Sequence, residues 1–489
     1  MTVEDIRRCI EEDTVSDRKK QAATGQRYYE ADHDILKHRM FYYNADGILV
    51  EDKARSNSRI CHPFFTELVD QLAAYIVSFD ENPIQAKPTA EGLQEHLDEY
   101  FDDVFWGEIE KLISGTAAKG FDYLYGYKNA EDRLTFQYAD GMGVVEVRQK
   151  DTDDGCEYVI YWYVDRIGKE NKKIKRIQVH DNAQITYYVQ VDDGSITLDD
   201  DVELNPRPNV VWTDAKGHRY ADALGFIPFW RLDNNQKQQS GLKPIKGLID
   251  DYDLMQCGLS NNLQDFDTPI HLVKGYEGDN LTELQQNIKT KKILGVSDTG
   301  GLDILTVDIP YQARKTKADE DEKNIYRFGM GFNSSQSGDG NITNVVIRSR
   351  YTLLDLKAGK LIKRLKAFLK GIIEVVLDEI NTNNGTDYQY TDVKVDFQPV
   401  VPTNEQENAQ NAKTEAETEQ IRINTILNVA TNIGDEQALK SICDILELDF
   451  DELKGKLEDP NSVENAEATL EGVITDEQPA EISSTAIPE

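Results

Sequence analysis

The spacing of apolar residues changes along the chain and divides it into helical and β-rich stretches. In the first 120 or so residues, apolar side chains recur at helical spacing, and we expect helices over 17–38, 61–79 and 91–118. From Tyr123 to about Trp230, runs of β-branched and aromatic residues alternate with turn clusters. The strands expected there span 144–148, 158–164, 174–179 and 185–191. Helical spacing then returns, and this order of helical and β-rich stretches predicts an α+β fold.

The most distinctive pattern is a short apolar strand followed by one long amphipathic helix. The strand begins near Ile227 and ends at a polar break, Asp233-Asn-Asn235. We expect the helix from Gly241 to Phe266, with Ser240 as its cap. Its apolar face has the spacing of three and four residues: Ile245, Leu248, Tyr252, Met255, Leu259, Leu263 and Phe266. The polar content is high for a core helix, which suits a helix packed beside copies of itself in a ring.

A small mixed segment, a second helix and a loop come next. Between residues 267 and 308, the expected elements are strands at 270–273, 292–294 and 302–307 and a short helix at 281–289. Pro310 precedes a polar, charged helix over 312–329. Residues 333–342 are rich in Gly, Ser and Asn, which is the composition of a flexible loop.

A long amphipathic helix is expected from Asn344 to Ile380, and its first part is basic. The basic residues are Arg348, Arg350, Lys357, Lys360, Lys363, Arg364, Lys366 and Lys370. Only Asp355 opposes them in this stretch. A solvated face, or ion pairs with acidic neighbours across a subunit interface, is the commoner explanation of such a run. Contact with DNA near the preceding loop is the alternative.

The C-terminal part is predicted to be helical and then disordered. A strand over 393–397 precedes a helix over 405–432. Shorter helices are expected at 438–446 and 449–457. Residues 458–489 contain nine acidic residues and no Lys or Arg, and Pro and small polar residues fill much of the rest. This composition is typical of a disordered acidic tail.

Three groups of residues resemble the portal proteins of tailed bacteriophages with long, non-contractile tails. The first group is Tyr28-Tyr29, His33-Asp34-Ile35, Asn57, Arg59-Ile60, His62, Phe64, Leu68-Val-Asp-Gln71, Tyr75 and Pro83. The second follows the Ile227-Pro-Phe strand end and is Leu248-Ile-Asp250, Tyr252-Asp253, Ser260-Asn-Asn262, Asp265-Phe266 and Gly275. The third is the run from Ser349 to Ala358. Their order and spacing over roughly residues 20–455 make the resemblance specific.

The resemblance implies the portal fold, a ring-forming α+β fold with named parts. The expected parts are the N-terminal helical part of the wing at 1–120, the β-rich wing at 121–235, stem helices at 240–266 and 309–330, a small α/β clip at 267–308, the tunnel loop at 333–343, a long spine helix at 344–383, a wing strand at 392–403, a helical crown at 404–457 and the disordered acidic tail at 458–489.

The implied function is a structural DNA channel and not an enzyme. A homo-oligomeric ring of about twelve copies would occupy one vertex of the virion capsid after assembly in the host cytoplasm. Double-stranded DNA would pass through it during packaging and ejection. The implied protein partners are the large terminase and then a head-completion adaptor at the clip, together with the scaffold and the major capsid protein.

The same resemblance implies which residues line the narrowest part of the pore. They are the polar loop residues Asn333, Ser334, Ser335, Gln336, Asp339, Asn341, Thr343 and Asn344. Their expected role is short-range polar contact with DNA, without readout of base sequence. Arg348, Arg350 and Lys357 are candidates for contact with DNA or with a neighbouring subunit.

Net charge and composition limit the classes of function. The chain has 54 Lys and Arg against 89 Asp and Glu, a formal net charge of −35. A protein that grips DNA phosphates carries basic patches, so tight DNA binding over a wide surface is not expected. The acidic excess has two explanations: solubility, or a channel wall that repels phosphates and lets DNA slide. No apolar run is long enough to span a membrane, and the acidic, polar N-terminus is unlike a signal peptide.

Candidate chemistry is sparse. The five cysteines stand singly, which favours reduced thiols over disulfides or a zinc site. The sequence contains no P-loop, no GxSxG and no HExxH motif, so we expect no cofactor and no metal, and another protein would supply the energy of packaging. Abundant Asp and Glu leave a carboxylate- or metal-dependent hydrolase or nuclease as one alternative. A non-viral scaffold that oligomerises through its long helices is the other.

Overall fold

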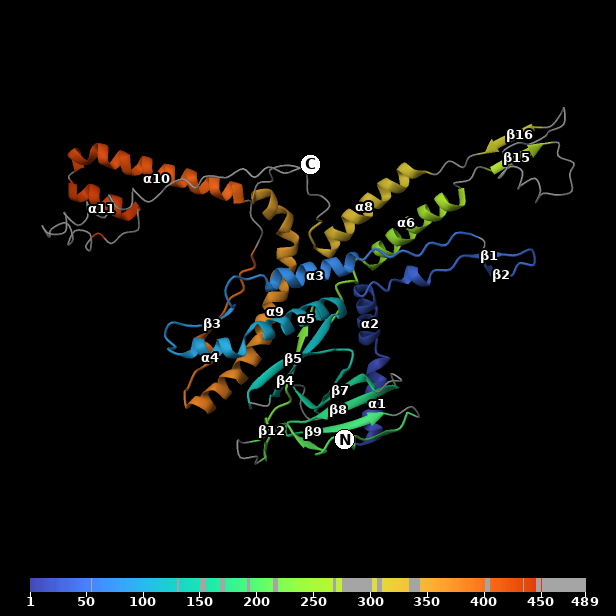
Figure 1. Cartoon of the computed structure of the whole chain (residues 1–489), viewed down its shortest axis with the longest axis horizontal. Helices are drawn as coiled ribbons and strands as arrows, with labels where there is room; N and C mark the ends of the chain where they lie inside the picture. Colours follow the sequence, from blue (N-terminus) through green and yellow to red (C-terminus); the bar gives the residue numbers. More distant parts are fainter. Residues whose placement is uncertain are drawn as a thin grey trace, which may run out of the picture. The chain divides into compact units, whose positions relative to one another are not determined.

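Helices and antiparallel strands alternate along the chain in the computed structural model (Figure 1). The described residues are 1–53, 55–129, 132–149, 155–167, 172–190, 194–213, 219–266, 270–274, 301–305, 310–333, 344–400, 405–433, 435–445 and 450. The chain divides into two units, and each is described by itself. The first takes in residues 1–340 and 348–401, and the second takes in residues 341–347 and 402–489.

The N-terminal helices of the first unit are α1 (Val3–Thr14), α2 (Asp17–Tyr29), α3 (Phe64–Val77), α4 (Leu93–Tyr100) and α5 (Asp103–Lys119). Side chains cap three of these helices, α1, α2 and α5. Ser16 caps α2 by accepting a hydrogen bond from the backbone N–H of Lys19 at 3.3 Å. Asp102 caps α5 in the same way, with the N–H of Phe105 at 2.9 Å. Each cap satisfies a backbone donor that the first helical turn leaves unpaired.

The structure corrects two of the predicted helices. The helix predicted over 17–38 ends with α2, because Ala31 has a φ of 60° and only a 3-10 turn, η1 (Asp34–Lys37), follows. The helix predicted over 91–118 is two helices, because Asp102 ends the first stretch and caps a new helix. In both cases the apolar spacing continues across the break, so periodicity alone could not locate it.

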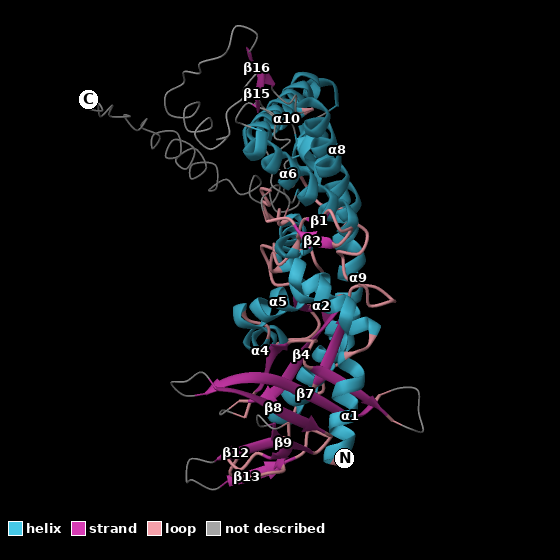
Figure 2. Cartoon of the chain, turned by 90° about the vertical axis from the view of Figure 1, so that its right-hand side faces the viewer, coloured by secondary structure: helices cyan, strands magenta, loops and turns pink. Residues whose placement is uncertain are grey.

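The strands after α5 form two main sheets. The smaller sheet has the order β14-β4-β5 and consists of β4 (Phe121–Lys128), β5 (Leu134–Ala139) and β14 (Phe229–Asp233). The larger sheet has the order β10-β9-β8-β7-β6, with β11 also paired to β9, and consists of β6 (Val144–Arg148), β7 (Cys156–Ile167), β8 (Lys172–His180), β9 (Gln184–Gln190), β10 (Ile196–Leu198) and β11 (Arg207–Pro208). A separate antiparallel pair consists of β12 (Val210–Thr213) and β13 (Arg219–Asp222). Helix α1 packs on the larger sheet through Ile6 and Ile10 (Figure 2).

Two helices that are separate in the sequence, α6 (Lys246–Phe266) and α8 (Tyr311–Gly329), pack side by side. Lys317 of α8 pairs with Asp251 of α6 at 2.6 Å. Between them in the sequence, β15 (Ile270–Lys274) and β16 (Gly301–Leu305) pair antiparallel. The predicted elements at 281–289 and 292–294 lie outside the described residues. Helix α6 begins later than the predicted Gly241, because residues 241–245 form turns.

The longest helix, α9 (Asn344–Asn384), enters the main core of the first unit. Its fully buried side chains include Leu365, Ile372 and Val376, which belong to the same apolar cluster as side chains of α3 and α5. After α9, a 3-10 turn, η4 (Tyr390–Asp392), leads to β17 (Val393–Val395). Strand β17 pairs with β3 (Ile84–Ala86), so the chain returns to the N-terminal helices.

The described part of the second unit is helical and includes the first residues of α9. It contains α10 (Glu405–Ile433) and α11 (Asp435–Ile445), which pack against each other. The predicted helix over 449–457, except residue 450, and the predicted acidic tail over 458–489 lie outside the described residues. Among the described residues, no helix is both long and apolar enough to cross a membrane.

Lys19 of α2 is buried and holds the turn before β6. Its Nζ donates to the carbonyl oxygens of Gly141 at 2.5 Å, Met142 at 3.1 Å and Val144 at 2.9 Å. It also forms an ion pair with Asp13 at 2.8 Å. One ammonium group therefore satisfies three carbonyl groups and a carboxylate in a place with little access to water.

Replacing Lys19 with Met should lower the free energy of unfolding by about 2–4 kcal/mol, because its buried acceptors lose their donor. Urea unfolding of the purified protein measures this change. The exposed neighbour provides the matched control, since Lys20→Met should change stability by no more than about 0.5 kcal/mol. Equal losses in the two variants would show that the buried contacts contribute nothing.

Candidate functional site

The predicted pore-lining loop lies mostly outside the described residues. Ser334, Ser335, Gln336, Asp339, Asn341 and Thr343 belong to the part that is not described. Asn333 and Asn344 are described: Asn333 follows α8, and Asn344 is the first residue of α9. The structure therefore describes where the loop begins and ends in the sequence and how its first residues are held.

The residues just before the loop are held on α3 and α9. The Gln71 side chain forms hydrogen bonds with both backbone groups of Phe332. Its Oε1 accepts from the Phe332 N–H at 2.9 Å, and its Nε2 donates to the Phe332 carbonyl at 2.8 Å. The Phe332 ring stacks on Tyr351 of α9, with centroids 4.9 Å apart and planes 12° apart. The Asn333 side chain donates to Glu322 Oε1 at 3.0 Å. The loop thus starts from a fixed point.

Two glycines let the end of α8 lie close to α3. A Cβ on Gly331 would be 2.1 Å from Leu68 Cδ2, and one on Gly329 would be 2.6 Å from Leu68 Cδ1. The helix ends where Met330 takes a φ of 56°, and the N–H of Gly331 then donates to Tyr326 O at 3.0 Å. This close approach brings Phe332 within reach of Gln71.

The structure separates the three basic residues proposed to contact DNA or a neighbouring subunit. Arg348 is exposed and Arg350 is half-buried. Lys357 is also half-buried, and its Nζ donates to the carbonyl of Gly329 at 2.8 Å, at the end of α8. Burial lowers the pKa of Lys357 to about 8. In this chain Lys357 therefore binds the end of α8.

Some of the other basic residues of α9 have acidic partners within the chain. Lys366 pairs with Asp396 at 3.5 Å, and Lys370 pairs with Glu374 at 3.6 Å. These are partly exposed pairs, each of small energetic value. Part of this basic run is thus ion-paired within one chain, whereas ion pairs across a subunit interface stay a prediction.

An extended segment, residues 56–62, lies along α6 and is called the strap below. Every second backbone N–H of the strap donates to a side chain at every fourth position of α6. The pairs are His62 with Asp253 Oδ1 at 2.9 Å, Ile60 with Cys257 Sγ at 3.2 Å, Ser58 with Asn261 Oδ1 at 2.6 Å and Ser56 with Asp265 Oδ1 at 3.1 Å. Two extended residues advance about 6.6 Å and four helical residues about 6 Å, so the two repeats nearly match.

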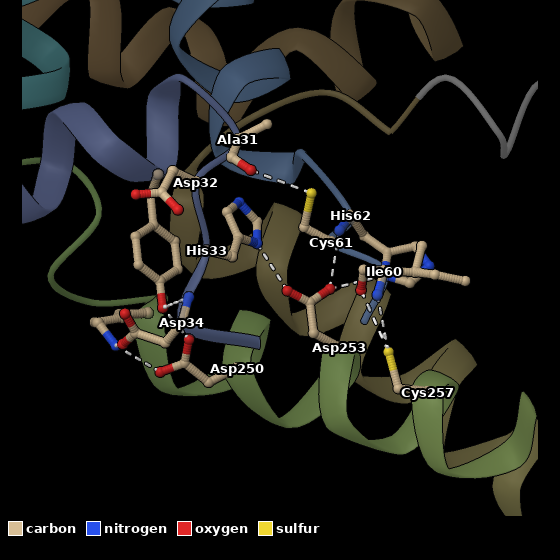
Figure 3. A network of polar contacts seen from close by, with 12 residues as sticks. Ala31, Asp32, His33, Asp34, Ile60, Cys61, His62, Asp250, Asp253 and Cys257 are labelled. Carbon is tan, nitrogen blue, oxygen red and sulfur yellow. Dashed lines mark hydrogen bonds and ion pairs between the residues drawn. The ribbon is translucent and has the colours of Figure 1, made fainter. Parts of the chain in front are cut away.

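Asp253 is the centre of this arrangement (Figure 3). Besides the strap N–H, it accepts hydrogen bonds from His33 Nδ1 and His62 Nδ1, each at 2.7 Å. Its side chain is 1 % exposed. Burial alone would raise the pKa of Asp253, but the hydrogen bonds from the two histidines outweigh it and hold the pKa below the ordinary value. His33 also stacks on Tyr28 at 4.5 Å between centroids.

A second polar cluster lies one turn earlier on α6. Lys246 Nζ binds Asp34 and Asp250, each at 2.7 Å, and the Tyr28 hydroxyl donates to Asp250. Burial would raise the pKa of Asp34, but its bonds to Lys246 and Arg27 outweigh it and hold the pKa well below the usual range. Together with Asp253, this cluster fastens the segment after α2 to α6.

The geometry is that of a structural clamp. Both histidines use Nδ1 to bind one carboxylate, and the described part of the chain contains no group of three His, Cys, Asp or Glu side chains that could hold a metal ion. Of the two nearby thiols, Cys61 donates to Ala31 O at 3.2 Å and Cys257 to Ile60 O at 3.4 Å. Sequence analysis named His33 and Asp253 only among the residues that carry the family resemblance and gave neither residue a structural role. The spacing of four between polar residues on α6 was the signal that could have revealed the strap.

Replacing Asp253 with Ala should lower the free energy of unfolding by about 3–5 kcal/mol, because one buried donor on His33 and two partly buried donors on His62 lose their acceptor. Trypsin should then cut faster in the basic segment that includes Arg55 and Arg59. Because the folded-state pKa of Asp253 lies below 3.8, the stability difference from wild type should persist above pH 3.8 and shrink as the pH falls further.

The matched control for this prediction is Asp251→Ala, which removes a half-exposed ion pair with Lys317. We expect it to change stability by no more than about 1 kcal/mol and to leave trypsin cleavage unchanged. Cleavage rates that are equal in Asp253→Ala and wild type would contradict the role of Asp253 as the anchor of the strap.

A family model and two related proteins both indicate the same family for this chain. The family model described as "Phage portal protein, SPP1 Gp6-like" matches residues 8–449. The portal protein of Bacillus phage SPP1 is 27% identical over 350 residues, which cover 71% of this chain and 67% of that protein. The portal protein of Clostridium phage phiCD119 is 25% identical over 412 residues, which cover 77% and 82%.

Among solved structures, a chain from the "Neck of native GTA particle computed with C12 symmetry" aligns with a TM-score of 0.38 and 13% identity. The alignment covers 73% of this chain and 86% of that one. The family assignment rests on the sequence matches, since the family model spans well over half of the chain. The chain belongs to the SPP1 Gp6-like family of phage portal proteins.

Proposed function

We propose that this chain forms the ring-shaped DNA channel at one vertex of a phage capsid, through which viral DNA is packaged and ejected. The observation that carries the proposal is the family match over residues 8–449. Portal proteins are structural components that form ring oligomers in the capsid. A closed ring generates a pore on its axis without any further element.

The way the polar loop is held supports its proposed place at the narrowest part of the pore. Its first residue, Asn333, follows a backbone that Gln71 and Tyr351 fix on two helices. A loop that starts from a fixed point can project toward passing DNA without moving its supports. The proposed lining remains Asn333, Ser334, Ser335, Gln336, Asp339, Asn341, Thr343 and Asn344. Most of these residues are uncharged, which suits short contacts with DNA that do not hold the DNA tightly.

The basic residues of α9 divide into two proposed roles. Arg348, which is exposed, is the best candidate for contact with DNA or with a neighbouring subunit, and half-buried Arg350 is the second. Lys357 acts within the chain, because its Nζ is bound to Gly329 O. We further propose that the segment at 267–308 meets the large terminase and then a head-completion adaptor. The scaffold and the major capsid protein are the proposed partners of assembly.

Electron microscopy of the purified protein tests the proposal directly. Class averages viewed along the particle axis should contain closed rings of about twelve or thirteen copies with a central hole. Open filaments, or monomers that digest DNA, would overturn it. If the protein stays monomeric when alone, the same imaging is repeated after co-expression with the scaffold and capsid proteins, and monomers under both conditions would also contradict a ring.

Replacing residues 334–343 with a short Gly-Ser linker should leave the ring intact and reduce DNA packaging or retention by at least about tenfold, because the proposed pore lining is removed. Packaging is measured as DNA protected from nuclease inside particles, and ring integrity by electron microscopy. A variant with the same ten residues in scrambled order is the control. It keeps the polar side chains of the loop and should package normally. Normal packaging by the linker variant would refute the role of the loop.

A further inference from the structure

A cleft of about 400 Å³ is lined by strands of both main sheets, and tyrosines stand on both of its walls. The smaller sheet contributes Tyr125 and Tyr127 of β4. The larger sheet contributes Tyr161 and Tyr163 of β7 and Tyr187 of β9. All five side chains are half-buried. We call this place the tyrosine cleft.

The pairing register explains why these side chains share one face of the larger sheet. Tyr161 lies opposite Gln178 of β8, and Gln178 lies opposite Tyr187 of β9. Because side chains alternate along a strand, Tyr163 lies on the same face as Tyr161. The opposite face of these strands carries the apolar side chains that pack against α1. The tyrosine face therefore takes no part in holding α1.

Aromatic contacts join the two walls of the cleft. Phe229 of β14 stacks on Tyr125 with centroids 4.7 Å apart and also contacts Tyr161 at 6.0 Å. The buried ring of His180 packs against Tyr125 at 5.3 Å and Phe229 at 4.9 Å. Its Nε2 donates to Gln178 Oε1 at 3.1 Å. The walls are thus preformed, which lowers the entropy lost when a ligand binds.

The hydroxyl groups of the cleft are available to a ligand. Within the part of the chain that the structure describes, four of them form no hydrogen bond, namely those of Tyr125, Tyr127, Tyr161 and Tyr163. A tyrosine hydroxyl can donate one hydrogen bond and accept another, and its ring supplies a rigid contact surface. The cleft therefore offers both flat apolar area and hydrogen bonds.

The positive charge of the cleft comes from Arg207 of β11. Burial raises the pKa of Tyr125 and Tyr187, and the nearby guanidinium of Arg207 opposes that rise, so its charge lies close to their hydroxyls. The other lining cation, Lys128, is already paired with Glu379 at 2.8 Å. Arg207 forms no ion pair with any carboxylate among the described residues.

This lack of a carboxylate contrasts with the rest of the chain. The sequence has 89 acidic residues, yet neither Asp nor Glu lines the cleft. Arg176, on the same face of the larger sheet, binds Asp165 at 3.3 Å and also binds Asp199. A guanidinium forms its strongest hydrogen bonds with a carboxylate, which can accept two of them. A ligand that brings a carboxylate would complete the cleft.

The lining favours a peptide over other anions. A nucleic-acid strand needs a series of basic residues along its phosphates, and the cleft has a single unpaired cation among the described residues. Grooves lined by aromatic residues are instead typical of sites that hold extended, proline-containing segments. Such a segment has no internal hydrogen bonds, so its carbonyl groups can accept from tyrosine hydroxyls.

We propose that the tyrosine cleft binds an extended, proline-containing segment of a partner protein, with an acidic side chain of that segment paired to Arg207. The tyrosine rings pack against the proline rings, and the hydroxyls donate to backbone carbonyls of the segment. This inference goes beyond the channel function, because it gives the sheets of the first unit a protein-binding site. It does not depend on the ring or on the polar loop.

Fluorescence anisotropy with synthetic peptides tests the charge pairing. The probe is fluorescein-labelled Ala-Pro-Pro-Glu-Pro-Pro-Ala, and a neutral probe has Gln in place of Glu. The full chain should bind the acidic probe with a Kd below about 1 mM and the neutral probe about tenfold more weakly. Arg207→Gln should weaken binding of the acidic probe about tenfold and leave binding of the neutral probe unchanged. Arg148→Gln removes an exposed arginine at the end of β6 and is the control, which should change neither.

A pair of conservative variants tests the hydroxyl groups. Tyr161→Phe with Tyr187→Phe keeps both rings and removes two hydroxyls, so binding of the acidic probe should weaken at least about fivefold. Tyr158→Phe with Tyr188→Phe is the matched control, because these tyrosines belong to the same two strands but pack on the apolar cluster of α1. It should bind as wild type does. Circular dichroism melting checks that each variant folds.

Photocrosslinking locates the bound segment. Benzoylphenylalanine replaces the first Ala of the acidic probe, and mass spectrometry after illumination should find crosslinks on β4, β7 or β9. Crosslinks on other elements would refute the proposal. Equal binding of the two probes, or no binding below about 1 mM, would refute it as well. Displacement of the probe by dAMP at a lower concentration than by unlabelled peptide would assign the cleft to nucleotides and overturn the peptide.

The outcomes separate this inference from the proposed function. Peptide binding is measured on the chain whether or not it has assembled. Absence of rings would refute the channel and leave the cleft unaffected, whereas rings that bind neither probe would refute the cleft and leave the channel unaffected.

Discussion

The first unit depends on one constraint: the backbone N–H groups of the strap have no partner strand to bind. An extended segment without a partner strand must find acceptors for its N–H groups, and burying them unpaired would be costly. Side chains of α6 supply these acceptors at every fourth position. The most enclosed of them, Asp253, also binds His33 and His62 and so joins the segment after α2, the approach to α3 and the middle of α6 at one carboxylate. Helix α8 then packs on the helix that this network has positioned.

The same chain of contacts reaches the proposed channel loop. Helix α3 begins two residues after His62, and its Leu68 receives the close approach of Gly329 and Gly331. Its Gln71 binds the backbone of Phe332 one residue before the loop begins. A clamp of buried hydrogen bonds on α6 and the proposed pore lining are therefore connected through a single helix. This connection explains how a polar, glycine-rich loop can have a defined origin in the proposed ring.

Sequence reasoning predicted the regular elements well where one repeat governs a long stretch. The strand-rich stretch after Tyr123, and α9, whose apolar face is buried, were recognisable from spacing alone. Breaks within helices were missed at Ala31 and Asp102, because a positive φ and a cap leave the apolar spacing unchanged. The strap was missed for another reason. Its partners on α6 lie about two hundred residues away, and the segment itself has no apolar period. The loop residues were named through family resemblance, and spacing alone could not have assigned them a role.

The match between the strap and α6 has a consequence for how such chains can change over evolutionary time. Successive N–H groups of an extended segment point in opposite directions. Loss of one residue from the strap would therefore turn its donors away from α6. Loss of two residues would preserve the alternation. The hairpin that precedes the strap, formed by β1 (Phe41–Tyr43) and β2 (Leu49–Glu51), is under no such rule, since its length does not affect which way the later donors point. Insertions should therefore accumulate in the hairpin, while the strap keeps its length or changes it only in pairs.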